Sequence, residues 1–261
     1  MAVITLTTDF GQDDHYVASL KGAILQIAPA AQIVDVTHSI AAHDVVGAAF
    51  VLRQVFDAFP DGTIHVVVVD PGVGTARRLI AAAYAGQIVL APDNGIVSLV
   101  HRDYELEELR TIANNRLFRG EVSATFHGRD VLAPVAAHLA RGLALLNVGP
   151  VIDQLEILNL ERPVTLPNGG IEGRVLYVDH FGNLISNICE ADLVAAVGNA
   201  AGASVFVGPL RVGPLRRTYG DVKPGEIVAI LGSTGMLEIA LNQGNAAAQL
   251  RATPGTIVMV R

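Results

Sequence analysis

The sequence contains one cysteine, no tryptophan and no long hydrophobic segment. Cys189 has no second cysteine to pair with, so an intramolecular disulfide is excluded and a reducing compartment is expected. No apolar run reaches the roughly 18 residues that a membrane-spanning helix needs. The first residues also lack the basic region and cleavage site of a signal peptide. We therefore expect a cytoplasmic protein with no membrane partner.

Basic residues are too few for a nucleic-acid-binding surface. The chain has 18 Lys and Arg against 25 Asp and Glu, which gives a formal net charge of −7. Such a balance argues against a nucleic-acid partner but allows a cationic small-molecule ligand. The common nucleotide-binding and hydrolase signatures are missing as well: a Walker A loop, GxGxxG after the first strand, GxSxG and a metal-spaced His pair. The function must therefore be sought in scattered residues.

The first 160 residues alternate between β-prone and helical patterns. We predict strands over 3–7, 33–36, 65–69 and 84–90, helices over 16–27, 44–56 and 129–140, a turn at 91–95 that completes a hairpin, and a short helix or turn over 96–100. Strands that alternate with helices are typical of a doubly wound α/β domain with a mostly parallel sheet. We expect this domain to occupy residues 1–160.

The pattern changes in the last hundred residues. Residues 161–170 are rich in Pro, Gly and Asn and are predicted to form a linker. Beyond it, short β-rich runs are separated by turns, at 171–178, 184–188, 203–207, 227–231, 237–240 and 256–260. Residues 171–261 are therefore expected to form a smaller domain, a β-barrel or a sandwich.

The stretch 64–78 organises the first domain. Residues 65–69 form an apolar β-branched run, which predicts a strand buried on both faces. Asp70 follows directly, and Arg77 and Arg78 lie within one loop length. Ligands of open α/β sheets bind at the carboxyl ends of the strands, so the loop is a candidate site. The alternative is a local ion pair without a function.

Other polar residues follow predicted strands of the same domain. Asp9 could accept two hydrogen bonds from a vicinal diol, or it could only cap the next helix. His127 precedes a predicted helix and is a candidate general base or water-orienting group, although a lone histidine is more often a structural loop residue. A metal site built from Asp9, Asp70 and His127 is a further possibility.

Two segments of the second domain could bind a ligand. In the turn at 178–183, the Phe181 ring could stack on a base and the Asn183 amide could pair with an adenine edge. The same segment could equally be a plain hairpin turn. The Gly-Ser-Thr-Gly segment at 232–235 is a weak indication of anion binding by backbone amides.

Taken together, these segments resemble those of the S-adenosylmethionine hydroxide adenosyltransferases, relatives of the S-adenosylmethionine-dependent fluorinase and chlorinase. The matching segments span both domains in the family's order: TTDFG at 7–11, VDVTHSI at 34–40, VVDPGVGT at 68–75, APDNG at 91–95, TFHGRDV at 125–131, VDHFGN at 178–183 and GSTG at 232–235. The resemblance implies hydrolysis of S-adenosylmethionine to adenosine and L-methionine without a metal or redox cofactor. It also implies a homotrimer with the substrate between neighbouring subunits.

The resemblance assigns roles residue by residue. A catalytic Asp-Arg-His set falls on Asp70, Arg77 and His127, with Arg78 outside it. Asp9 is expected to contact the ribose diol. Phe181, Asn183 and Tyr219 are expected to contact the adenine, although Tyr219 is aligned only across a two-residue gap. Asp179 and Ser233 are expected near the methionine amine and carboxylate.

Departures from the halogenases favour the hydrolytic branch. The fluorinase has Tyr in place of Asp70, Thr in place of Val73, Tyr in place of His127 and Ser in place of Gly128. A carboxylate at Asp70 would repel a halide and suits a water molecule. The fluorinase Arg near the methionine carboxylate is Thr234 here, which leaves that contact unassigned. A chlorinase-like enzyme, a binding module without turnover and a metal-dependent hydrolase are the alternatives.

Overall fold

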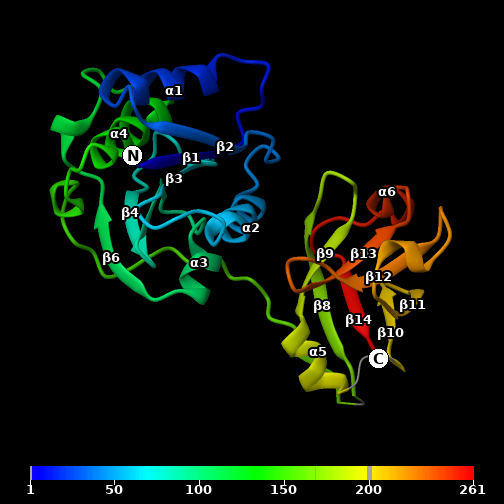
Figure 1. Cartoon of the computed structure of the whole chain (residues 1–261). Coiled ribbons are helices and arrows are strands. Elements are labelled where there is room, and N and C mark those ends of the chain that lie inside the picture. Colours follow the sequence, from blue (N-terminus) through cyan, green and yellow to red (C-terminus); the bar gives the residue numbers. More distant parts are fainter. Residues whose placement is uncertain (1, 168, 199–201) are drawn as a thin grey trace. The chain divides into compact units, whose positions relative to one another are not determined.

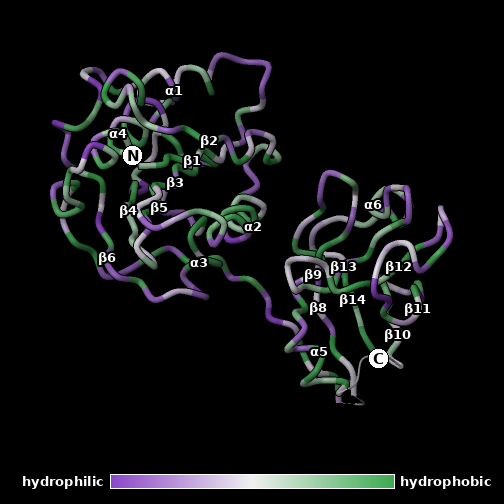
Figure 2. The backbone as a smooth tube through the Cα atoms, viewed as in Figure 1, coloured by the Kyte–Doolittle hydropathy of each residue, from purple (hydrophilic) through white to green (hydrophobic). Residues whose placement is uncertain are grey.

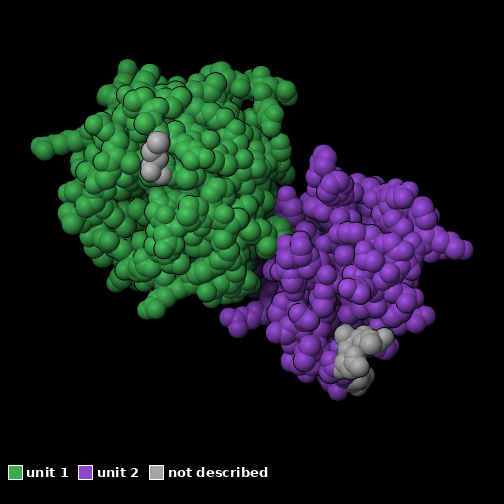
Figure 3. All heavy atoms as spheres, viewed as in Figure 1, with its two compact units in different colours: residues 1–158 green, residues 159–261 purple. Residues whose placement is uncertain are grey.

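The computed structural model describes residues 2–167, 169–198 and 202–261, which divide into two compact units between residues 158 and 159 (Figure 3). The stretch 161–170, expected as a linker, contains a short strand, β7 (Val164–Thr165), which pairs with the first long strand of the second unit. None of the helices described is long and apolar enough to cross a membrane.

The first unit is built around a six-stranded sheet in the order β2-β1-β3-β5-β4-β6 (Figure 1). Its strands are β1 (Val3–Thr8), β2 (Gln32–Thr37), β3 (Ile64–Val68), β4 (Leu79–Tyr84), β5 (Gln87–Pro92) and β6 (Leu106–Thr111). The β1–β2, β1–β3 and β3–β5 pairs are parallel, whereas β4 runs antiparallel to both neighbours. Every residue of β3 is buried, which confirms the prediction of a central strand.

Helices cover both faces of this sheet, which confirms the doubly wound α/β prediction. The unit contains α1 (Tyr16–Ile27), α2 (Val45–Phe56), α3 (Ser98–Asp103) and α4 (Ala133–Ala140). One core includes Ile24 of α1 and Val135 of α4 packed with Val66. The core on the opposite face includes Leu52 of α2 and Val100 of α3. Figure 2 shows α2 as largely hydrophobic, as expected for a helix pressed against a sheet.

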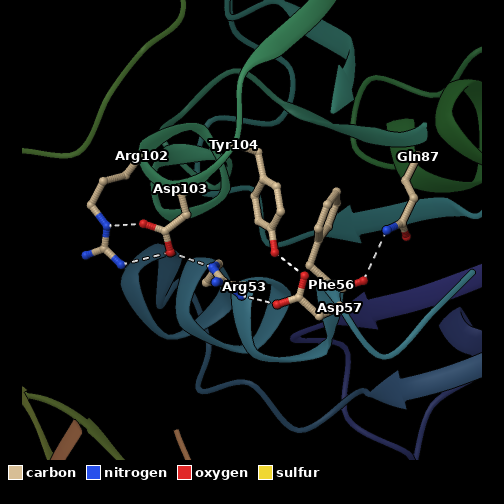
Figure 4. A network of polar contacts seen from close by, with 7 residues as sticks. All are labelled: Arg53, Phe56, Asp57, Gln87, Arg102, Asp103 and Tyr104. Atoms are coloured by element: carbon tan, nitrogen blue, oxygen red, sulfur yellow. Dashed lines mark hydrogen bonds and ion pairs between the residues drawn. The ribbon is translucent and has the colours of Figure 1, made fainter. Parts of the chain in front are cut away.

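A polar network ties α2 to α3 at the edge of the second core (Figure 4). Arg53 donates to Asp103 over 2.6 Å and to Asp57 over 3.0 Å, and the Tyr104 hydroxyl also donates to Asp57. Gln87 of β5 donates to the carbonyl of Phe56 over 3.2 Å. Because these groups satisfy one another, the network fixes the last turn of α2 and is a structural feature.

The predicted hairpin turn at 91–95 is wrong. The hairpin is formed by β4 and β5, and its turn is Ala85–Gly86, where both residues have positive φ, 45° and 71°. The sequence pattern missed β4 because its alanines have low strand propensity and it is buried on both faces, so it shows no alternation. Short helix α3 confirms the prediction of a helix or turn near 96–100.

The second unit is a closed seven-stranded barrel with one further strand, β7, at its edge. Of the two predicted architectures, a barrel or a sandwich, the barrel is therefore confirmed. Its strands are β8 (Ile171–Val178), β9 (Leu184–Cys189), β10 (Ser204–Val207), β11 (Leu210–Arg216), β12 (Ile227–Leu231), β13 (Met236–Leu241) and β14 (Ile257–Val260). Pairing of β14 with β8 closes the ring. The interior is apolar and includes Leu184, Val205, Leu237 and Ile239.

Among the described residues of this unit, helices α5 (Glu190–Val197) and α6 (Ala246–Leu250) and strands β7 and β11 were not expected. Gly213 and Pro214 lie inside β11, in a stretch where no β-rich run was predicted, and Gly213 adopts φ 122° beside a register shift in the β10–β11 pairing. The pair therefore marks a bulge that bends the strand around the barrel.

Candidate functional site

Asp70 and Arg77 face each other across the loop that follows β3. Arg77 Nε lies 2.9 Å from both carboxylate oxygens of Asp70, and Arg77 Nη2 lies 2.5 Å from Asp70 Oδ2. Both side chains are largely buried, with 8% of Asp70 and 11% of Arg77 exposed. The guanidinium therefore balances a charge that would be costly to bury alone.

His127 joins this pair from a second loop. Arg77 Nη2 lies 2.8 Å from His127 Nδ1. A guanidinium can only donate, so Nδ1 is the acceptor and the proton of the neutral imidazole is on Nε2. Burial and the nearby Arg77 charge lower the pKa of His127, which favours the neutral ring. Of the two sequence hypotheses for His127, this tautomer supports the water-orienting donor rather than the general base.

Close packing holds the two loops together. Gly74 has φ 79°, and a Cβ at this position would lie 2.8 Å from the carbonyl oxygen of Ala124, so only glycine fits without displacement. Phe126, next to His127, packs edge-on against Phe10 and Tyr16 with ring centroids 5.6 and 5.4 Å away. This aromatic cluster was missed at the sequence level, because its three rings come from distant segments.

The lowered pKa of His127 predicts that kcat/KM falls at acid pH, which gives the pH profile an acid limb. Protonation would place an N–H on Nδ1 directly opposite the Arg77 donor and break their hydrogen bond. We expect kcat/KM to be constant above pH 6.5, the ordinary value for histidine, and to fall with a midpoint below it. His127→Gln should remove this limb and lower the plateau. His138→Gln, a histidine of α4 whose pKa is also lowered, is the control and should leave the profile unchanged; loss of the limb there would contradict the assignment.

Asp9 follows β1 and is half-buried. Its Oδ2 accepts the backbone N–H of His43 over 2.9 Å. His43 adopts φ 67°, a left-handed conformation that is strained for a residue with a side chain. This contact fixes one carboxylate oxygen and leaves Oδ1 as the better acceptor for a ligand. His43 has no sequence signal that would have linked it to Asp9.

Arg78 belongs to a different pair from Arg77. Its Nε and Nη2 lie 2.9 and 2.5 Å from Asp93 Oδ2, and Asp93 Oδ1 accepts the N–H of Glu156 over 2.9 Å. The Asp93 side chain is 1% exposed. Asp93, in the Pro-Asp-Asn-Gly segment at 92–95, is thus held by Arg78 and Glu156. Among the described residues, the hydrogen bonds of the Arg78 side chain go to Asp93 and to the carbonyl of Gln154, and not to Asp70 or His127.

Arg78→Ala is therefore expected to affect stability more than activity. Removal of the guanidinium leaves a buried carboxylate without its cation, which should lower the free energy of unfolding by about 1–3 kcal/mol. The turnover of the folded protein should stay within a few-fold of wild type. Urea unfolding and steady-state kinetics measure the two effects, with the exposed Arg116→Ala as control. An inactive but fully stable Arg78→Ala would mean that Arg78 acts in the site.

In the second unit Asp179 organises the turn at 178–183. Its Oδ1 accepts the backbone N–H groups of Phe181 and Asn183 over 2.9 and 2.8 Å, and its Oδ2 accepts Asn183 Nδ2 over 2.9 Å. Phe181 projects outward with 71% of its surface exposed, whereas Asn183 is 7% exposed. An exposed aromatic ring held by a rigid turn can bind a flat ligand.

Tyr219 and Ser233 lie on two further turns of the same unit. Tyr219 is 41% exposed, and its hydroxyl donates to Glu238 Oε1 over 2.6 Å. Burial and the Glu238 carboxylate raise the pKa of Tyr219 to about 12, so the hydroxyl keeps its proton at neutral pH. Burial and the Asp179 charge raise the pKa of Glu238. Ser233 is exposed on the turn between β12 and β13. Glu238 was missed, although a lone acid in an apolar strand was a signal.

The sequence left open a metal site, and the described residues can be searched for one. No group of three or more His, Cys, Asp or Glu is placed there to hold a metal ion. Asp9, Asp70 and His127 therefore do not form the ligand set considered from the sequence.

The first unit thus has the features of an α/β protein whose charged Asp-Arg-His group follows a central strand, and the second is a barrel with aromatic residues on its turns. Residues 4–149 match the model of the SAM hydroxide adenosyltransferase N-terminal domain, and residues 173–259 match that of the C-terminal domain. The chain belongs to the SAM hydroxide adenosyltransferase family.

Relatives of known name agree with this membership. The chain is similar to "(R)-S-adenosyl-L-methionine hydrolase" of Salinispora tropica, with 40% identity over 97% of this chain and 95% of the relative. The hydrolase of the same name from Thermus thermophilus is 41% identical over 94% of both chains, and a fluorinase of an Actinoplanes species is 32% identical over 92% and 91%. A crystal structure of an uncharacterized conserved protein from Thermotoga maritima superposes with a TM-score of 0.91 at 38% identity, covering 100% of this chain and 99% of that one.

Proposed function

We propose that this protein hydrolyses S-adenosyl-L-methionine to adenosine and L-methionine. The observation that carries the proposal is the largely buried Asp70–Arg77 pair bonded to His127, in a chain that is 40% and 41% identical to two proteins named as hydrolases of this substrate. The fluorinase is a more distant relative at 32% identity. A carboxylate at Asp70 also disfavours a halide at this position, because two anions repel.

The reaction joins a water oxygen to C5′ of the ribose and breaks the C5′–S bond. The sulfonium leaves as the neutral thioether of methionine, and the water gives up one proton to the Asp70 carboxylate, which passes it on to solvent. Attack by an oxygen with developing negative charge on a cationic substrate neutralises charge, so a site that excludes water favours the transition state. Arg77 keeps Asp70 in place, and Asp70 as acceptor and His127 Nε2–H as donor position the water.

Binding of the substrate is proposed to involve both units. Asp9 accepts from the ribose hydroxyls, Phe181, Asn183 and Tyr219 bind the adenine, and Asp179 and Ser233 bind the methionine amine and carboxylate. The support is the family resemblance together with the half-buried Asp179–Asn183 contacts and the exposed rings of the second unit. We also propose a cytoplasmic homotrimer in which one subunit's first unit and a neighbour's second unit complete the site.

The test is a product assay with purified protein. Incubation with S-adenosylmethionine should yield adenosine and methionine in equal amounts, and excess chloride or fluoride should not produce 5′-chloro- or 5′-fluoro-adenosine at a comparable rate. Activity should persist in a chelator, since Asp70, Arg77 and His127 are proposed to act without a metal. Tight binding with no product would favour a binding module, and halogenated product would favour a halogenase.

A further inference from the structure

Glu238 is a buried carboxylate in an apolar strand. It is 6% exposed on β13, between Leu237 and Ile239, whose side chains belong to the barrel interior. Side chains alternate along a strand, so Glu238 is directed to the outer face. There a second small cluster contains Ile230, its register partner on β12, with Ala240.

The fold alone gives little reason for an acid at this position. A buried carboxylate is costly unless it is paired with a cation or fully hydrogen-bonded. Among the described residues no Lys, Arg or His forms an ion pair with Glu238, and the Tyr219 hydroxyl donates a hydrogen bond to its side chain. Gly232 leaves room for the other oxygen, because a Cβ there would lie 2.4 Å from Glu238 Oε2. The Tyr219 hydroxyl is thus a defined hydrogen-bond partner of this carboxylate.

Tyr219 is held at both ends. Its backbone lies in the 3₁₀ turn Tyr219–Asp221, and Asp221 Oδ2 accepts the N–H groups of Arg217 and Thr218 over 3.0 and 3.2 Å. Its ring is 41% exposed, and its hydroxyl is held by Glu238. The Asp179 charge acts on both Tyr219 and Glu238, so the pair lies near the turn at 178–183.

We propose that Glu238 is a positioning residue of the substrate site, which holds the Tyr219 ring through its hydroxyl in the orientation that covers the adenine. The inference rests on the proposed function, which assigns Tyr219 to the adenine. A ring that is fixed before binding loses less rotational freedom when the ligand binds. Immobilising a free side chain of this kind lowers the affinity for the ligand roughly 2- to 12-fold, so a ring that is already held avoids this loss. Glu238 therefore acts on substrate binding and not on the chemical step.

Four variants separate this role from a structural one. Glu238→Leu and Tyr219→Phe each remove the hydrogen bond, and each should raise KM for S-adenosylmethionine about 3- to 10-fold with kcat within about twofold. Glu238→Gln keeps an acceptor oxygen and should stay close to wild type. The Glu238→Leu, Tyr219→Phe double variant should be no worse than the poorer single, because both remove one interaction. Glu172→Leu, a carboxylate of β8 in the same barrel, is the control.

Adenosine affinity, measured by calorimetry, and melting temperature complete the test. An unchanged KM and adenosine affinity in folded Glu238→Leu would overturn the proposal, as would a fall in kcat alone. A Glu238→Gln variant as poor as Glu238→Leu would show that the charge, and not the hold on Tyr219, matters. If Glu238→Leu fails to fold, Tyr219→Phe still tests the same bond. If the wild-type protein releases no adenosine from S-adenosylmethionine, the proposed function is refuted. The adenosine affinities of the variants would still test whether Glu238 positions Tyr219.

Discussion

Asp70→Asn is expected to lower kcat by roughly 10²–10⁴, the range for a positioned acid–base group. The neutral amide keeps the shape of the side chain but presents an NH₂ group toward Arg77 or the water, and it removes the charge that Arg77 balances. His127→Ala and Arg77→Ala should cause losses in the same range. Binding of S-adenosylmethionine should change far less, because the proposed adenine and ribose contacts are made by other residues. Single-turnover kinetics and equilibrium binding measure the two quantities separately.

The double variant Asp70→Asn, His127→Ala distinguishes one unit from two independent groups. Both side chains are bonded to the same guanidinium, so their effects should not add, and the double variant should be little worse than the poorer single. Arg78→Lys is the best adjacent control, since it keeps a cation beside the buried Asp93. Normal turnover in every variant would place the active site elsewhere. An inactive Arg78→Lys beside an active Arg77→Ala would mean that the two arginines have been assigned in the wrong order.

Asp9→Asn is expected to weaken substrate binding by about 1.5–3 kcal/mol, typical of a lost charged hydrogen bond. This corresponds to roughly 10- to 150-fold in Kd. The amide oxygen can still accept the His43 N–H, so the loop should remain in place and the loss should reflect the ligand. Calorimetric titration with adenosine measures the effect without turnover.

A 2′-deoxy ligand tests whether Asp9 contacts the ribose diol. It should bind wild type poorly and lose little more on Asp9→Asn, because the variant and the ligand remove the same contact. Additive losses in this cycle would argue against a direct contact. Asp44→Asn is a control in the same segment, since Asp44 caps α2 through the Gly47 N–H over 2.8 Å.

Much of the candidate site could be predicted from strand ends. Asp9 and Asp70 each follow a β-prone run, and parallel strands bring such residues to one edge of a sheet. The family resemblance assigned Arg77 to Asp70, but the spacing alone could not distinguish Arg77 from Arg78, because both arginines lie within one loop length of Asp70. The three-dimensional path of the loop decides it: Gly74 packs against Ala124, Arg77 faces Asp70 and His127, and Arg78 turns to Asp93.

The sequence by itself determined the two-part organisation, the buried central strand and most elements, including α1 and β8 with their full bounds. These follow from local periodicity and from turn residues, which are properties of neighbouring positions. Elements with weak local signals, such as alanine-rich β4 and bulged β11, form only because their partners bury them. The tautomer of His127, the contact of His43 with Asp9 and the bond from Tyr219 to Glu238 depend on residues far apart in the chain. Only tertiary packing determines which side chains meet, because hydrogen bonding and burial act over ångström distances in space and not along the sequence.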